Sequence, residues 1–311
     1  MYCVPRIRRL HPPRRRQKAA RLVSIVVRQK RSLQMTSIVV WPNFELDRCP
    51  SMWVVGDTRV SFANGSLILE DAAKILGLPL VCREPDQSGF FSRAYFEHSF
   101  GYCFAGSTLM GQNSYLSLVP LLSNLVSANR YVPSMSDVAN FALKYIRKTF
   151  DEYKERVGPS AMFEAAIFGW CRVNNQLEIW HFRPELQNDV YEISLASHVD
   201  PQFKDFLYLG DEKQEVERLL RNAFDEIAAP GRPPERSPRR VVDELIADRG
   251  RASIGGDQQL AIANQFGFQP YMLLRPRVVG QPQAYMSYLG MELNHENNTV
   301  GQAVVGGPGM A

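Results

Sequence analysis

The sequence lacks the marks of a membrane, disulfide-bonded or metal-dependent protein. Its five cysteines are scattered and odd in number, and no two of them form a C-x-x-C pair. No apolar run approaches the ~18 residues that a membrane-spanning helix needs, and no signal peptide opens the chain. The five histidines show no metal-ligand spacing. These absences favour a protein of the reducing cytoplasm with inert buried thiols and no membrane contact.

The best-known catalytic patterns are missing too. We find no Ser-His-Asp arrangement, no Walker loop and no dinucleotide-binding fingerprint. One histidine, His181, lies in the alternating stretch Leu177–Phe182, which is typical of a strand. We expect it to be packed in a sheet rather than catalytic.

The positive net charge of +4 comes from one end of the chain. The first 34 residues hold 11 of the 36 basic residues and none of the 32 acidic ones, so the remainder carries a net charge of −7. Such an arm cannot build a core, and we expect it to be disordered. It is an organelle transit peptide, a contact for nucleic acid or another anionic surface, or a segment absent from the mature protein. We favour the third interpretation, with the true start at Met35 or a propeptide cut directly after it, and we predict no nucleic-acid partner.

Four residues at the ends of predicted strands suggest a catalytic site. Thr36 opens a short β-branched strand, and the apolar run Trp53–Val55 leads into Asp57. Lys74 follows 17 residues later, and a third apolar strand ends on Gly106, before a helix. Each residue alone has an ordinary structural role, as a turn, surface or cap residue. Their combination favours catalysis because of the family that this order of residues resembles.

The chemistry explains why these residue types belong together. An N-terminal threonine carries its own base, because an α-amine titrates near pH ~8 and can take the hydroxyl proton. Positive charge on Lys74 would lower the pKa of that amine and hydroxyl, and Asp57 would hold the lysine by pairing with it. The Gly106 amide, at a helix N-terminus, could stabilise an oxyanion. Thr36 has the required amine only in a chain that begins there.

This order of residues resembles the N-terminal-nucleophile hydrolases of the proteasome β-subunit type, most closely the bacterial HslV-type peptidase subunits. Those proteins similarly place a nucleophile on the first strand, an aspartate after the second, a lysine about 16 residues later and an A-G-[GS] turn, here Ala105–Ser107. The resemblance implies an α+β fold, a four-layer αββα sandwich of two antiparallel sheets flanked by helices.

The resemblance also implies a function. It is that of a threonine-type endopeptidase, an amide hydrolase that cleaves peptides or unfolded proteins through an acyl-enzyme and needs no cofactor. It further implies self-association into a ring, with an ATP-dependent unfoldase as a candidate partner. Two alternatives stay open: a non-catalytic proteasome-like assembly subunit, and an N-terminal-nucleophile amidase that acts on a small amide.

The sequence departs from the family in two places. Where the family has a glycine-serine-glycine turn, this chain has Leu209-Gly210-Asp211, which leaves Asp211 as a substitute for the relay serine. Ser253 follows Asp248 by five residues instead of three, so we treat it only as a neighbour of the site.

The remaining pattern predicts one domain, residues 35–293, after the arm 1–34 and before a flexible tail, 294–311. Helices are expected at 108–127 and 136–156, after Asp211 with Val216 to Ile227 on its apolar face, and at 241–249. Strands are expected at 162–171, 176–182, 190–195, 259–263, 269–274 and 285–293. Loops are expected at 41–52 and 81–99, with an exposed linker at 229–240.

Overall fold

The computed structural model describes residues 36–46, 49–62, 65–226, 233–275, 284–294, 296 and 298–310. All of them belong to one compact unit, Leu33–Ala311. The basic arm and the predicted start at Met35 lie outside the described residues. In the part that the structure describes, no helix is both long and apolar enough to cross a membrane.

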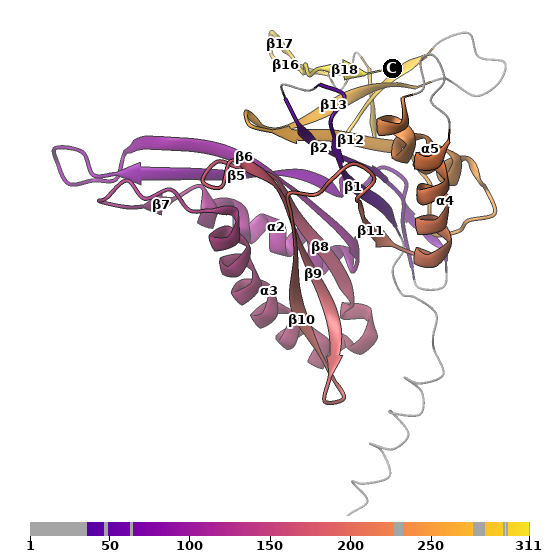
Figure 1. Ribbon diagram of the computed structural model, residues 1–311, viewed down its shortest axis with the longest axis horizontal. Coiled ribbons are helices and arrows are strands. Elements are labelled where there is room, and N and C mark those ends of the chain that lie inside the picture. The colour runs from indigo at the N-terminus through magenta and orange to yellow at the C-terminus, as the bar shows by residue number, and fades with distance from the viewer. Residues whose placement is uncertain are drawn as a thin grey trace, which may run out of the picture. The chain divides into compact units, whose positions relative to one another are not determined.

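The first of two large sheets, the β1 sheet, carries the start of the described chain (Figure 1). Its strand order is β11-β1-β2-β12-β13-β14-β15, with β18 added in parallel to β13. The bounds are β1 Ser37–Asn43, β2 Ser51–Asp57, β11 Leu207–Gly210, β12 Gln258–Asn264, β13 Gly267–Arg275, β14 Tyr285–Tyr288, β15 Met291–Leu293 and β18 Gly309–Met310.

The second sheet, the β6 sheet, has the strand order β10-β9-β8-β6-β5-β7. Its bounds are β5 Ile75–Glu84, β6 Arg93–Gly106, β7 Leu125–Val126, β8 Phe163–Cys171, β9 Gln176–Gln187 and β10 Val190–Val199. All of its pairings are antiparallel except β5 with β7. Two small two-stranded sheets complete the described part: β3 Val60–Ser61 with β4 Leu67–Leu69, and β16 Thr299–Val300 with β17 Ala303–Val304.

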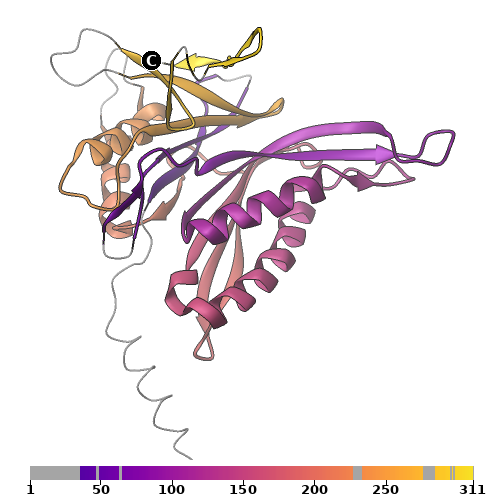
Figure 2. The ribbon, with the colours of Figure 1, turned by 180° about the vertical axis from the view of Figure 1, so that it is seen from behind.

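The helices fall into two pairs, which Figures 1 and 2 show against different sheets. Their bounds are α2 Thr108–Leu122, α3 Met135–Val157, α4 Lys213–Asp225 and α5 Ser237–Ala247, with 3₁₀ turns η1 Gly158–Ala161 and η2 Pro234–Arg236. Helix α3 starts with a capping box, in which the Ser134 hydroxyl accepts from the Asp137 amide and Asp137 accepts from the Ser134 amide. Its apolar stripe then faces the β6 sheet.

Three apolar clusters hold these layers together. The first joins α2 and α3 to the β6 sheet, with Phe104, Ile146 and Phe163 among its members. The second joins α4 and α5 to the β1 sheet, around Trp41 and Leu220. The third contains residues of both sheets, such as Ile38 and Phe168. Burial of apolar surface in all three is the main stabilising term of the fold.

The structure confirms the predicted α+β class and most elements. The helices predicted at 108–127 and 136–156 correspond to α2 and α3, and the predicted strands at 162–171 and 176–182 correspond to β8 and β9. The predicted strand at 285–293 is a hairpin, β14–β15. Residues 303–310, in the predicted tail, contribute β17 and β18.

Three loop predictions need correction, and for the loop predicted at 41–52 the correction concerns only the bounds, because β1 and β2 leave 44–50 between them. Residues 81–99 are mostly the outer parts of β5 and β6, and Tyr95 and Phe96 belong to β6. Pro42 lies inside β1, where it pairs with Met52 of β2 and lies beyond Val40, the last residue of β1 that pairs with β11. The predicted linker 229–240 includes η2 and the first turn of α5, where Pro238 occupies a position that tolerates proline; residues 229–232 lie outside the described part.

Candidate active site

Thr36 stands directly before β1, between two neighbouring strands. Ser37, the next residue, pairs with Gly210 of β11, and Ile38 pairs with Gly56 of β2. The Thr36 carbonyl accepts a hydrogen bond from the Asp211 amide at 3.0 Å. Gly210 has φ +132°, and a Cβ there would lie 1.8 Å from the Thr36 carbonyl oxygen. Glycine is therefore required where β11 passes Thr36.

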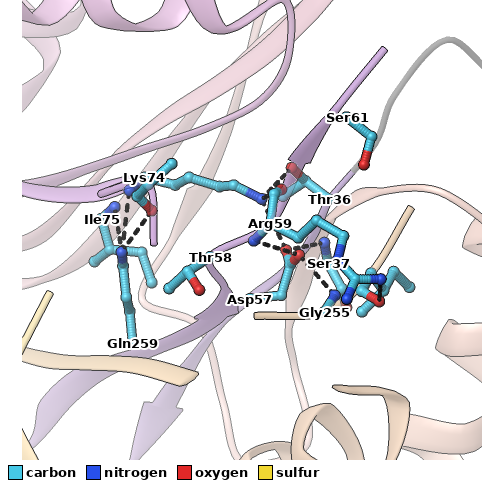
Figure 3. A network of polar contacts seen from close by, with 12 residues as sticks. Thr36, Ser37, Asp57, Thr58, Arg59, Ser61, Lys74, Ile75, Gly255 and Gln259 are labelled. Carbon is cyan, nitrogen blue, oxygen red and sulfur yellow. Dashed lines mark hydrogen bonds and ion pairs between the residues drawn. The ribbon is translucent and has the colours of Figure 1, made fainter. Parts of the chain in front are cut away.

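The Lys74 ammonium lies beside the Thr36 hydroxyl (Figure 3). Its Nζ donates to Thr36 Oγ1 at 2.8 Å, to Asp57 Oδ1 at 3.0 Å and to the Arg59 carbonyl at 2.5 Å. These three acceptors use all three ammonium donors. The Lys74 side chain is 2 % exposed, so the charge is held almost wholly by protein groups.

Asp57, at the end of β2, accepts hydrogen bonds from three backbone amides. Its Oδ1 accepts from the Ser37 amide at 2.9 Å as well as from Lys74. Its Oδ2 accepts from the amides of Arg59 and Gly255, each at 3.2 Å. Asp57 thus joins the start of β1, the turn after β2 and the segment before β12, in addition to pairing with Lys74.

Burial sets the electrostatics of this pair. It lowers the pKa of Lys74, and the neighbouring Asp57 charge opposes that shift. It also raises the pKa of Asp57, opposed by the Lys74 charge and by the Ser37 and Gly255 amides. The Lys74 ammonium lies 2.8 Å from the Thr36 hydroxyl and has a lowered pKa. It can therefore donate a hydrogen bond to this hydroxyl and exchange a proton with it.

Gly106 is the last residue of β6. This strand pairs with β5, and Lys74 lies directly before β5. The Phe104 amide donates to the Lys74 carbonyl at 3.3 Å, which places Gly106 two residues from this contact. Gly106 has φ +91°, and a Cβ there would lie 2.7 Å from the Met162 carbonyl oxygen. The turn into α2 therefore requires glycine. Ser107 follows as the N-cap of α2, without a side-chain cap.

The two further predicted residues lie on segments that touch this centre. Asp211 meets Thr36 through its amide and is buried, and its carbonyl accepts from the Tyr208 hydroxyl at 2.6 Å. Ser253 lies two residues before Gly255, on the segment between α5 and β12 that binds Asp57. The structure thus places Lys74 in direct contact with both Thr36 and Asp57, with Asp211 bound to Thr36 and Ser253 nearby along the chain.

Several contributors were not predicted from the sequence. Ser37 and Gly255 supply amides to Asp57, Arg59 supplies a carbonyl to Lys74, and Gln259 binds the backbone on either side of Lys74. Most of these roles belong to backbone groups, which residue identity does not reveal. Among these contributors, only Gln259 acts through its side chain, and the sequence marks it as a polar residue at the start of an apolar strand.

The predicted packing role of His181 agrees with its burial. Its Nε2 lies 2.8 Å from Glu164 Oε2, and both residues are buried, His181 on β9 and Glu164 on the neighbouring strand β8. No group of three or more His, Cys, Asp or Glu side chains in the described residues is arranged to hold a metal ion.

Comparisons with known proteins give structural relatives only. No protein-family model matches the chain, and no curated protein matches it. Among solved structures, the Anbu complex of Pseudomonas aeruginosa, solved as a helical assembly, matches at 13 % identity and a TM-score of 0.47, covering 81 % of this chain and 86 % of that one. Anbu (ancestral beta-subunit) from Yersinia bercovieri matches at 12 % identity and a TM-score of 0.43, covering 74 % and 82 %.

The prediction of an HslV-type subunit was therefore wrong. The two solved structures described above are Anbu, the ancestral β-subunit, which is a different family from the HslV-type peptidases. At these identities and TM-scores the likeness assigns no activity, so the function has to be argued from the site itself.

Proposed function

We propose that this chain is a proteasome-like subunit and an N-terminal threonine hydrolase that cleaves peptide amide bonds through an acyl-enzyme. The observation that carries the proposal is the 2.8 Å contact between Lys74 Nζ and Thr36 Oγ1, together with the Asp57 carboxylate behind the lysine. Lysine is a pKa-tuning neighbour that a threonine nucleophile needs.

The proposed reaction uses the groups around Thr36 in two steps. Thr36 Oγ1 attacks the substrate carbonyl carbon, and its proton passes to the Thr36 α-amine. The amine then gives this proton to the departing amine as the C–N bond breaks, which leaves an ester on Thr36. Water hydrolyses the ester by the same proton path in reverse.

The neighbouring residues have supporting roles in this proposal. Lys74 lowers the pKa of the hydroxyl and the amine, and Asp57 fixes the lysine. The Gly106 amide is the proposed oxyanion donor, which fits a backbone turn that only glycine can occupy. Asp211 and Ser253 are proposed neighbours of the proton path.

The reaction requires a free Thr36 amine, so the test uses a chain that starts at Thr36. Such a chain is made by cleaving a fusion partner directly before Thr36 and confirmed by intact mass. A peptide epoxyketone is the probe, because it reacts with a hydroxyl and an α-amine of the same residue together. We expect one adduct per chain, at Thr36, in the processed protein and none in a chain that retains Met35.

Substitutions separate the proposal from its alternatives. Thr36→Ala should abolish labelling and Thr36→Ser should retain it, while Ser37→Ala serves as the neighbouring hydroxyl control. Absence of any adduct in the processed chain would reject the hydrolase and leave a non-catalytic assembly subunit. Labelling by a small electrophile without cleavage of any peptide in a mixed library would favour an amidase of small amides.

We also propose that the chain works as a homo-oligomer. Helix α2 contains no charged residue, yet it exposes Leu109 by 60 % and Leu116 by 67 %. An uncharged surface helix with exposed leucines is typical of an interface. Sedimentation velocity should show an assembly that Leu116→Lys weakens, and a monomer in the unsubstituted chain would refute this. A ring and an unfoldase partner remain predictions.

The αββα order of layers is proposed on the three apolar clusters. One cluster combines residues of the two sheets, and each of the others combines one sheet with its own helix pair. An experimental structure of the processed chain would test this order together with the position of Thr36.

A further inference from the structure

The side chain of Gln259 is buried, and all four of its hydrogen bonds are made to backbone groups. Its Oε1 accepts from the amides of Lys74 and Ile75, both at 3.1 Å. Its Nε2 donates to the carbonyls of Ala72 at 2.8 Å and Leu289 at 3.0 Å. The side chain is 3 % exposed, so water does not compete for these groups.

Only one orientation of the amide satisfies this arrangement. Turning it over would place the NH₂ group against two N–H donors and the oxygen against two carbonyls. The Gln259 amide is therefore fixed in one orientation by its backbone partners. Its oxygen accepts from Ile75, the first residue of β5, and from Lys74, directly before it, whose side chain extends to Thr36 (Figure 3).

Gln259 also joins segments that lie far apart in the sequence. It belongs to β12 of the β1 sheet, whereas Lys74 and Ile75 begin the β6 sheet, 185 and 184 residues earlier. The Leu289 carbonyl comes from the turn between β14 and β15. In that turn Gly290 has φ +91°, and a Cβ would lie 2.5 Å from Thr58 Cγ2, next to Asp57.

We infer that Gln259 is the positioning residue for Lys74, and that it links the ammonium to the C-terminal β14–β15 hairpin. The inference rests on the proposed function only for its catalytic consequence. Without the Gln259 side-chain amide, the Lys74 and Ile75 amides lose their shared acceptor and the Ala72 carbonyl loses a donor, while the Phe104 amide still holds the Lys74 carbonyl. The ammonium then shifts relative to the Thr36 hydroxyl.

The test compares Gln259→Met with Gln258→Met, a matched control on the same strand. Gln258 is 1 % exposed and hydrogen-bonds with Arg239 instead, through Nε at 3.2 Å and the carbonyl at 3.0 Å. Both variants remove a buried glutamine amide and keep a similar volume. Only the first removes contacts to Lys74.

The first readout does not depend on any enzyme activity. The processed chain is treated with an amine-acetylating reagent, and acetylation of Lys74 is followed by peptide mass spectrometry at a temperature where each variant is folded. We expect Lys74 to resist acetylation in the unsubstituted chain and in Gln258→Met, and to react in Gln259→Met. Equal protection in both variants would overturn the inference.

The second readout is the rate of Thr36 labelling by the epoxyketone. Misplacing a catalytic group by ~1 Å costs up to about a hundredfold in rate. We expect Gln259→Met to lose between about tenfold and a hundredfold in the maximal labelling rate with little change in probe binding, and Gln258→Met to lose neither. If the unsubstituted chain is not labelled, the proposed function fails, and Lys74 acetylation still decides the role of Gln259.

A second variant covers the case in which Gln259→Met does not fold. Gln259→Glu keeps an acceptor for the Lys74 and Ile75 amides and loses the donors to Ala72 and Leu289. It should therefore protect Lys74 from acetylation while it loosens the β14–β15 hairpin, seen as faster amide exchange there. Acetylation of Lys74 as rapid as in unfolded protein would overturn the inference.

Discussion

The Asp57–Lys74 pair leads to a prediction about the free energy of unfolding, which can be measured separately from Thr36 labelling. Asp57→Asn replaces a fully buried carboxylate that accepts four hydrogen bonds, two at each oxygen. Either orientation of the new amide puts an NH₂ group against two donors. The substitution also leaves the Lys74 ammonium buried without its counter-ion.

The magnitude follows from the burial of both partners. Removing one partner of a buried ion pair costs about 3–5 kcal/mol in the free energy of unfolding. For a domain of this size, each kcal/mol of lost unfolding free energy lowers Tm by about 2–4 °C. We therefore expect Tm to fall by about 6–20 °C. Thr36 labelling should fall with it, measured below the new Tm.

The matched control is Asp225→Asn. Asp225 pairs with Lys204 at 2.6 Å, a similar contact distance, but both side chains are largely exposed, and such surface pairs contribute below about 1 kcal/mol. Scanning calorimetry and urea unfolding of both variants give the comparison. A Tm shift for Asp57→Asn no larger than that for Asp225→Asn would refute the argument that this buried pair holds the centre together.

Three further predictions address the surroundings of the pair. Gly106→Ala should lower the free energy of unfolding by about 1–3 kcal/mol more than Gly158→Ala, because both glycines have positive φ but only Gly106 would bring a Cβ against backbone; urea unfolding of both measures this. Thr36 labelling should rise with pH as the α-amine loses its proton and fall again as Lys74 loses its own. Because burial lowers the pKa of Lys74, the descending limb should lie below the ordinary lysine value of ~10.4, and a limb at or above that value would contradict the shift. Arg251→Gln should destabilise the chain by about 1–3 kcal/mol and reduce the salt dependence of Tm, because this mostly buried guanidinium binds three carboxylates; an unchanged Tm would contradict it.

The sequence was sufficient to predict the elements that carry the candidate site. Apolar runs end at Asp57 and before Gly106, and the structure has β2 and β6 end at these two residues. The order of strands and helices follows from periodicity, because each stripe must face a core. The approach of Lys74 to Thr36 was expected from the resemblance to the proteasome β-subunit type, and the structure places the two side chains in contact.

The backbone contacts of the site were not predictable in this way. The amide of Gly255 reaches Asp57 across 198 residues, and Ser37 reaches it across 20. Any residue type supplies an N–H, so composition does not mark these donors. The HslV-type assignment was wrong for a related reason, since the order of a few chemical groups does not distinguish between families that share it.

The contacts around Lys74 suggest why its position depends on both sheets. An ammonium on a four-carbon stem has many conformations, and its three acceptors come from Thr36 before β1, Asp57 at the end of β2 and Arg59 just after it, all on one side. The stem starts in the other sheet, so relative movement of the sheets would change every distance at once. Gln259 ties the base of the stem to the β1 sheet that also presents the acceptors. The nucleophile and the lysine therefore share one frame, and any variant that loosens this tie should affect Lys74 before it affects the rest of the core.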